Sequence, residues 1–275
     1  MTTLDLPYPE LAKGRFVSLD AYTDEALFAQ TRVRIAFTTR QGGVSEGPYA
    51  ALNLGSHVGD DLAAVKRNRA LLLEAFTRND TPLLVPNQVH GDTVLSIDSV
   101  EEAEALQQKA QEGADALVVG VPQVASLLCY ADCVPVIIVS PTRRFAVVHA
   151  GWRGVMNRIS VKSVHLMAQQ DVPILGEGAQ RTYNVYIGPH IRKECFETSE
   201  DLYQRFIDEF GSGCDAGYRH IDLSNALRTQ LEEMGVQPAR ICDLRACTVC
   251  GNEEFFSYRA QGGTAGRHGA FAVAQ

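Results

Sequence analysis

The sequence lacks the features of a secreted or membrane-bound protein. Its first residues, MTTLDLPYPELAKGRF, include no basic stretch followed by an apolar one, so we expect no signal peptide. No apolar run reaches the roughly 18 residues that a membrane-spanning helix needs. An excess of basic residues is also missing, and the net charge of −8 argues against a phosphate-backbone partner such as DNA. We therefore expect a cytoplasmic protein with no membrane and no nucleic-acid partner.

The seven cysteines lack the pattern of a disulfide framework, because their number is odd and no secretion signal accompanies them. They are expected to serve as thiols or metal ligands. Cys247 and Cys250 form a C-x-x-C motif, but a second closely spaced ligand pair is missing. The sequence therefore predicts no structural zinc site at this motif.

The composition, with 45% hydrophobic and 21% charged residues, is typical of a globular protein. Short apolar runs predict strands at residues 33–39, 83–85, 93–97, 115–119, 124–130, 184–188, 240–246 and 255–259. Helical periodicity with capping residues predicts helices at residues 60–76, 99–113, 155–169 and 222–235. We predict a fold of the α+β (mixed α/β) class, in which residues 1–275 form one domain of mixed β-sheets flanked by helices. Residues 1–30 are expected to be a peripheral N-terminal extension.

A predicted hairpin brings a thiol and an imidazole together. Residues 131–154 read ADCVPVIIVSPTRRFAVVHAGWRG, so that Cys133 opens one apolar run and His149 closes the next. If Val139 pairs with Arg143, Cys133 lies opposite His149, whereas pairing Val139 with Phe145 makes them diagonal neighbours. Both registers place the two side chains on one face. A buried cysteine beside a core histidine is the alternative, but the Gly-rich exit AGWRG favours a functional site.

A third candidate ligand, His90, stands in PNQVHGDTV just before a predicted strand. With Cys133 and His149 it completes a His/Cys/His set. Three protein ligands leave the fourth tetrahedral position open, as in catalytic rather than structural zinc sites. Spacing alone does not bring His90 to the hairpin, and a resemblance to known proteins supplies that link.

The motifs NQVHG, GADALV, ADCVPV, VVHAGWRG and YIGPHI follow one another here, between TTRQGGVSEGPYAALNLGSHVGD and FFSYRAQGGTAGRHG. In this the chain resembles the YfiH-type laccase-domain family, also called polyphenol oxidoreductases and peptidoglycan-editing factors. Members are described as purine nucleoside phosphorylases with accompanying adenosine deaminase activity. The resemblance implies a cytoplasmic zinc enzyme of mixed α/β fold, with His90, Cys133 and His149 as metal ligands and catalytic residues.

Further motif residues suit a nucleoside and phosphate site. Arg40 precedes two glycines that allow close backbone approach to an anion, and it is the first phosphate candidate. Arg153 in GWRG is the second candidate, and Arg267 lies in another Gly-rich stretch. His57, in NLGSHVGD, is expected to contact ligand. The sequence carries no signal for an oligomeric state.

Four functions stay open at this point. The first is zinc-dependent phosphorolysis of adenosine, inosine or methylthioadenosine to free base and ribose 1-phosphate, with adenosine deamination. The second is a multicopper laccase, which the absence of any His-x-His pair disfavours, although a single Cu²⁺ ion fits the ligand set. The third is a cysteine hydrolase that edits peptidoglycan precursors, with Cys133 as nucleophile and His149 as base. The fourth is a metal-stabilised binding module without catalysis.

Overall fold

Strands that are apolar on both faces give the protein its layered structure. The computed structural model describes residues 5–77 and 80–275. In β8 (Val134–Val139), alternate residues such as Val136 and Ile138 face helices, whereas Ile137 and Val139 face a second sheet. A strand covered on both sides needs a continuous apolar run, and VPVIIV provides one.

Two sheets of six strands each pack face to face, and each sheet mixes parallel and antiparallel pairs. The first sheet has the order β1 (Ala12–Phe16), β2 (Leu19–Thr23), β3 (Val33–Thr38), β12 (His268–Ala274), β7 (Ala125–Tyr130) and β4 (Leu83–Leu84). The second has the order β11 (Ile241–Asp243), β10 (Asn184–Ile187), β8, β9 (Phe145–Ala150), β6 (Ala116–Val119) and β5 (Val94–Ile97).

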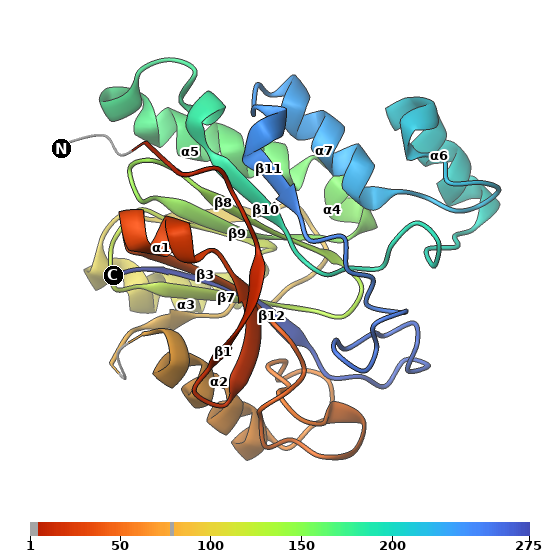
Figure 1. Ribbon diagram of the computed structural model, residues 1–275, viewed down its shortest axis with the longest axis horizontal. Coiled ribbons are helices and arrows are strands. Elements are labelled where there is room, and N and C mark those ends of the chain that lie inside the picture. The colour runs from red at the N-terminus through yellow and green to blue at the C-terminus, as the bar shows by residue number, and fades with distance from the viewer. Residues whose placement is uncertain (1–4, 78–79) are drawn as a thin grey trace.

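Helices cover the outer faces of both sheets (Figure 1). The second sheet is covered by α4 (Trp152–Met156), α5 (Ile159–Leu175), α6 (Glu200–Phe210) and α7 (Leu223–Glu233). The outer face of the first sheet is covered by α2 (Leu62–Phe76), through residues such as Leu72 and Phe76. Two shorter helices contact sheet strands, α1 (Glu25–Thr31) at β3 and α3 (Ala103–Ala110) at β4 and β5. Short 3₁₀ turns are at Gly47–Tyr49, Val100–Glu102, Ala179–Thr182, Gly211–Cys214 and Pro238–Arg240.

These layers confirm the predicted mixed α/β class, and most predicted strands are present. Asp61 and Asp222 cap α2 and α7, as the sequence indicates. The prediction of a strand at residues 255–259 is wrong: this segment forms turns, and its buried Phe255 and Phe256 pack without strand pairing. The central strand β12 is not predicted, because HGAFAVA is rich in small residues. Within the described residues, no helix has the length and apolar character to cross a membrane.

The hairpin β8–β9 adopts the second of the two predicted registers. Val139 pairs with Phe145, and Pro135 pairs with His149. Cys133, which directly precedes β8, is therefore a diagonal neighbour of His149. Odd-numbered residues of β9, such as Val147, face the space between the sheets, and His149 lies on this face. The candidate site thus lies at one open end of the sheet-to-sheet interface.

Candidate active site

The structure brings together the three predicted ligands from separate parts of the chain. The ligand atoms of His90, Cys133 and His149 all lie within 4.8 Å of one another. His149 is buried at the end of β9, Cys133 is half-buried, and His90 is exposed in the loop before β5. The ring of buried Tyr130 lies 5.3 Å from that of His149 and backs it from the first sheet. The cluster is therefore buried at His149 and open to solvent at His90.

Asp115, directly before β6, holds both histidines in place. Its Oδ1 lies 2.8 Å from His149 Nδ1, which places the proton on Nδ1 and leaves Nε2 free to bind a metal ion. The same carboxylate accepts the backbone N–H groups of Val89, His90 and Gly91. His90 has a φ of 58°, a left-handed conformation that non-glycine residues adopt only when held. The hydrogen bonds to Asp115 stabilise this backbone conformation of His90.

The space around Gly151, the residue that follows β9, leaves no room for a side chain. A Cβ at this position would lie 3.1 Å from Cys133 Sγ and 3.3 Å from His90 Cδ2. Both separations are tighter than ordinary packing allows, so a side chain would press the two ligands apart. The Gly-rich exit from the hairpin therefore serves the site directly.

The protein groups polarise one another strongly. Burial alone would raise the pKa of the Cys133 thiol, but the charge on His149 and hydrogen bonds from His149 and His90 lower it to about 6. Burial alone would lower the pKa of His149, but the charge of Cys133 and the hydrogen bond to Asp115 raise it to about 9. Burial of Asp115 is likewise outweighed by the hydrogen bond to His149, and its pKa is lowered. Cys133 is therefore a thiolate at neutral pH, which is the form that binds metals.

The donor set fits a zinc ion. Two imidazole nitrogens and one thiolate are ligands that zinc prefers, and bonds of about 2.0–2.3 Å to one ion place such ligands roughly 3–4 Å apart. Copper is compatible with the same donor types. His149 also has the carboxylate partner that metal-bound histidines usually have. His90, Cys133 and His149 can therefore hold one metal ion with an open position toward solvent.

A cavity of about 430 Å³ opens above the cluster. Besides the three ligands, two further predicted residues line it, His57 and Arg267. Burial and the positive charges of Arg267 and Arg69 lower the pKa of His57, so this ring is neutral at neutral pH. Arg267 Nη1 donates to the carbonyl oxygens of Ala265 and Gly266, which fixes the guanidinium at the cavity wall.

The other two predicted phosphate ligands lie elsewhere. Arg40 is not among the residues that line this cavity: its Nε donates to Ala50 O and its Nη1 to Asn252 O, both at 2.8 Å. Its guanidinium also stacks on Phe256. Arg153, exposed on α4, stacks on its neighbour Trp152 with 4.4 Å to the ring centroid. Arg40 thus connects two loops, and Arg153 stays at the surface.

Sequence reasoning missed several residues that shape this site. Asp115 stands in the quoted motif GADALV, and an aspartate directly before a strand next to metal-binding histidines was the available signal. Phe196, Tyr258 and Arg259 line the cavity, although they come from segments outside the strands. Arg259 N–H donates to Asp132 Oδ2 at 2.8 Å, next to Cys133. No local pattern reveals that contact, since the residues are far apart in sequence.

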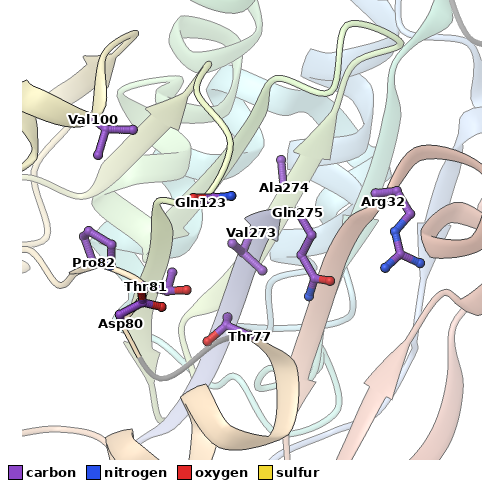
Figure 2. Close-up of a pocket in the computed structure, with 10 residues that line it drawn as sticks. All are labelled: Arg32, Thr77, Asp80, Thr81, Pro82, Val100, Gln123, Val273, Ala274 and Gln275. Carbon is purple, nitrogen blue, oxygen red and sulfur yellow. The ribbon is translucent and has the colours of Figure 1, made fainter.

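A different cavity, of about 340 Å³, lies at the end of the first sheet that is opposite to the candidate site (Figure 2). Gln123, Val273 and Gln275 line it, near the start of β7 and the end of β12, whereas the candidate site adjoins the end of β7. None of the predicted site residues lines this cavity. It therefore takes no part in the site described here.

The sequence predicts no structural zinc site at Cys247 and Cys250, because a second closely spaced ligand pair is missing, but the structure adds a third cysteine to this motif. The sulfur of Cys195 lies with theirs, and all three sulfurs are within 4.8 Å of one another. The sequence could not indicate this grouping, because Cys195 is isolated in the chain.

Comparison with known proteins gives a consistent family. A curated protein of Bacteroides thetaiotaomicron named "Purine nucleoside phosphorylase" is 34% identical, covering 88% of this chain and 92% of its own. The protein "Adenosine deaminase RL5", from an unknown prokaryotic organism, is 34% identical over 84% of this chain and 90% of its own. The crystal structure of Bacillus licheniformis YfiH superposes with a TM-score of 0.82 at 25% identity, covering 94% and 97% of the two chains. The family model described as "Multi-copper polyphenol oxidoreductase laccase" matches residues 34–275. The YfiH-type resemblance is thereby confirmed, and the chain belongs to this laccase-like family.

Proposed function

We propose that this protein is a zinc enzyme that acts on purine nucleosides, splitting adenosine and inosine with phosphate and deaminating adenosine. The observation that carries the proposal is the cluster of His90, Cys133 and His149 at the floor of a nucleoside-sized cavity that also holds Arg267. The names of its relatives support nucleoside chemistry. Methylthioadenosine, which carries the same base, is a further candidate substrate. Free thiols near the surface suit a reducing compartment, and we propose the cytoplasm.

The ligand set would bind one zinc ion, which supplies Lewis-acid polarisation and water activation when bound. Asp115 occupies Nδ1 of His149, so Nε2 is the nitrogen that would bind the metal ion once its proton is displaced. The backbone turn at His90 is fixed by the same carboxylate. We propose that these residues hold the reacting centre without rearrangement during turnover, which favours catalysis by preorganisation.

The cavity walls offer separate partners for phosphate and base. We propose that Arg267 and neutral His57 bind phosphate, because they are the two predicted candidates that line the cavity. Phe196 and Tyr258 line the same cavity and offer aromatic faces on which a purine can stack. In phosphorolysis a phosphate oxygen bonds to the anomeric carbon of ribose, and the departing base keeps the electron pair of the broken bond. Arg267 would hold the attacking phosphate in place.

Deamination would use the same floor. A water oxygen adds to the purine carbon that carries the amino group, and ammonia leaves. The residues of this chain would position the base edge above the cluster and exclude bulk water from it. We further propose that residues 1–275 work as one domain, with residues 1–30 as an N-terminal addition at the edge of the first sheet.

A cysteine hydrolase is the second candidate, and one observation favours it. The lowered pKa of Cys133 and the raised pKa of His149 describe a thiolate–imidazolium pair, as cysteine nucleophiles use. Such an enzyme would act on peptidoglycan precursors without metal. A multicopper laccase is less favoured, because the described residues gather only two sets of three potential ligands, and one of these is purely cysteine.

One paired measurement separates these functions. Elemental analysis of the purified protein is combined with assays on adenosine and inosine, each with and without phosphate. We expect one zinc at the His/Cys/His set, release of base and ribose 1-phosphate only with phosphate, and inosine with ammonia from adenosine. Several copper ions, turnover by metal-free protein, or bound metal without nucleoside turnover would each contradict the proposal.

A further inference from the structure

Three cysteines form a second cluster outside the cavity. Cys195 follows β10, and Cys247 and Cys250 follow β11. The sulfur atoms of Cys195 and Cys250 are 3.5 Å apart, and all three sulfurs lie within 4.8 Å of one another. Three thiols from two segments that are about fifty residues apart are thus directed at one point.

The backbone after Cys247 forms a tight turn. Gly251 N–H donates to Cys247 O at 2.8 Å. The sequence here is C-T-V-C-G, and a Cβ at Gly251 would lie only 2.9 Å from Cys247 O, so the tight turn needs glycine. The turn therefore folds the C-x-x-C motif around one common centre.

The two segments are also tied together by their backbones. His190 and Cys247 form an isolated parallel bridge, with His190 N–H donating to Ala246 O and Thr248 N–H to His190 O. These contacts fix the position of Cys195 relative to the C-x-x-C turn without any bond between sulfurs. The backbone of the two segments therefore positions the three cysteines next to one another.

We propose that Cys195, Cys247 and Cys250 are a second metal site, which binds one zinc ion through three thiolates. Bonds of about 2.3 Å to a tetrahedral zinc place two sulfurs roughly 3.8 Å apart, close to the 3.5 Å between Cys195 and Cys250. A disulfide needs about 2.05 Å and would leave the third sulfur without a partner. Thiolate sets favour zinc among divalent ions. Because Cys250 is exposed, solvent supplies the fourth ligand.

This site would brace the wall of the substrate cavity. Phe196, which lines the cavity, is the neighbour of Cys195. Arg259, also at the cavity, donates through its guanidinium to Cys195 O and Glu197 O. Thr248 Oγ1 donates to Asp132 Oδ1 at 2.6 Å, one residue from Cys133. A metal ion here would fix the positions of the two segments that carry Cys195 and the C-x-x-C motif. The proposal of this second site does not depend on which reaction takes place in the cavity.

The test counts metal ions per chain in protein purified under reducing conditions with zinc. We expect two for the wild type, one for Cys250→Ser, one for His90→Ala, and none when both changes are combined. Cys242→Ser, a thiol on β11 outside the cluster, is the matched control and should keep two. The zinc that Cys250→Ser retains at the other site also shows that this variant has folded.

Cobalt substitution identifies the ligands independently of activity. Sulfur-to-cobalt charge-transfer absorption grows with the number of thiolates, so His90→Ala should keep a strong band from three sulfurs. Cys250→Ser should keep only the weak band of Cys133. The proposal is overturned if Cys250→Ser retains both metal ions or the strong band. It is equally overturned if His90→Ala binds no metal ion, or if mass spectrometry finds Cys195 and Cys250 joined as a disulfide.

Discussion

Asp115 links the two histidines of the site through one carboxylate: its Oδ1 lies 2.8 Å from His149 Nδ1 and accepts the backbone N–H of His90 at 3.0 Å. The orientation of one ring and the backbone of the other ligand therefore depend on the same group. Any change in this carboxylate moves both nitrogen ligands together.

Asp115→Asn should weaken zinc binding by about 10- to 100-fold, as loss of a carboxylate behind a metal-bound histidine typically does. The amide removes the charge that fixes the His149 tautomer and weakens the turn at His90. Competition with a chelator measures the affinity. Asp92→Asn, an exposed aspartate that pairs with Lys162, is the matched control. Equal affinities of the two variants would remove Asp115 from the site.

Gly151→Ala should lower metal affinity while leaving the fold intact. The added methyl group would lie 3.1 Å from Cys133 Sγ and 3.3 Å from His90 Cδ2, and the backbone φ of −64° accepts alanine. Gly91→Ala is the control, because its methyl group would meet only ordinary contacts at 3.5 Å. Metal titrations beside thermal unfolding separate the two effects. Wild-type affinity in Gly151→Ala would show that the ligands can move apart freely.

Arg267→Ala should raise the KM for phosphate, with little change in zinc content, because Arg267 lines the cavity and does not belong to the ligand cluster. Arg40→Ala should instead lower stability, by about 1–3 kcal/mol, since it loses two hydrogen bonds to carbonyl oxygens. Arg153→Ala, at the surface, serves as control for both assays. A larger effect of Arg40 than of Arg267 on the KM for phosphate would reverse this assignment.

Iodoacetamide should modify Cys133 slowly in the zinc form and faster after chelation, because a metal-bound sulfur has its lone pair committed. In chelated protein the rate should rise with pH around a midpoint of about 6, since the thiolate forms above its pKa. Peptide mass spectrometry assigns the modified cysteine. Full nucleoside turnover after chelation, lost on alkylation of Cys133, would favour the cysteine hydrolase.

His268, buried on β12, should make the fold sensitive to acid. Burial and the charges of Arg267 and Arg40 lower its pKa to about 3, so the folded protein keeps it neutral while the unfolded chain protonates it near pH 6.5. The unfolded state then binds more protons between these values, and stability falls as pH drops, by up to about 1.4 kcal/mol per unit. His268→Leu should flatten this dependence in denaturant titrations. His165→Leu, at an exposed position of α5, should leave the slope unchanged.

The sequence predicts those parts of the fold that depend on local pattern. VPVIIV and FAVV are read as strands because a doubly covered strand needs uninterrupted apolar residues, and the two possible registers of Cys133 and His149 include the observed one. The central position of β12 could not be predicted. It pairs Ala270 with Phe37 and with Leu128, and such distant pairing leaves no mark on a short alanine-rich run.

In the candidate site too, local sequence pattern predicts some features, whereas contacts between distant residues determine the others. His90 joins the hairpin only through a loop that Asp115 fixes, and the resemblance to a family, not the spacing, suggested it. The sequence ranked Arg40 before Arg153 and Arg267 as a phosphate ligand, although an arginine beside glycines can contact an anion or connect two loops equally well. The structure places them differently: Arg40 donates to backbone carbonyls of two loops away from the cavity, whereas Arg267 lines the cavity.

The origin of the cavity residues has a consequence for directed evolution. Cys133 and His149 are anchored at strand ends, whereas Phe196, Tyr258 and Arg267 come from segments between the regular elements. A library confined to these wall segments can alter substrate preference without touching the reactive floor. New selectivities should therefore be reachable in this scaffold at full metal content, through changes in loops alone.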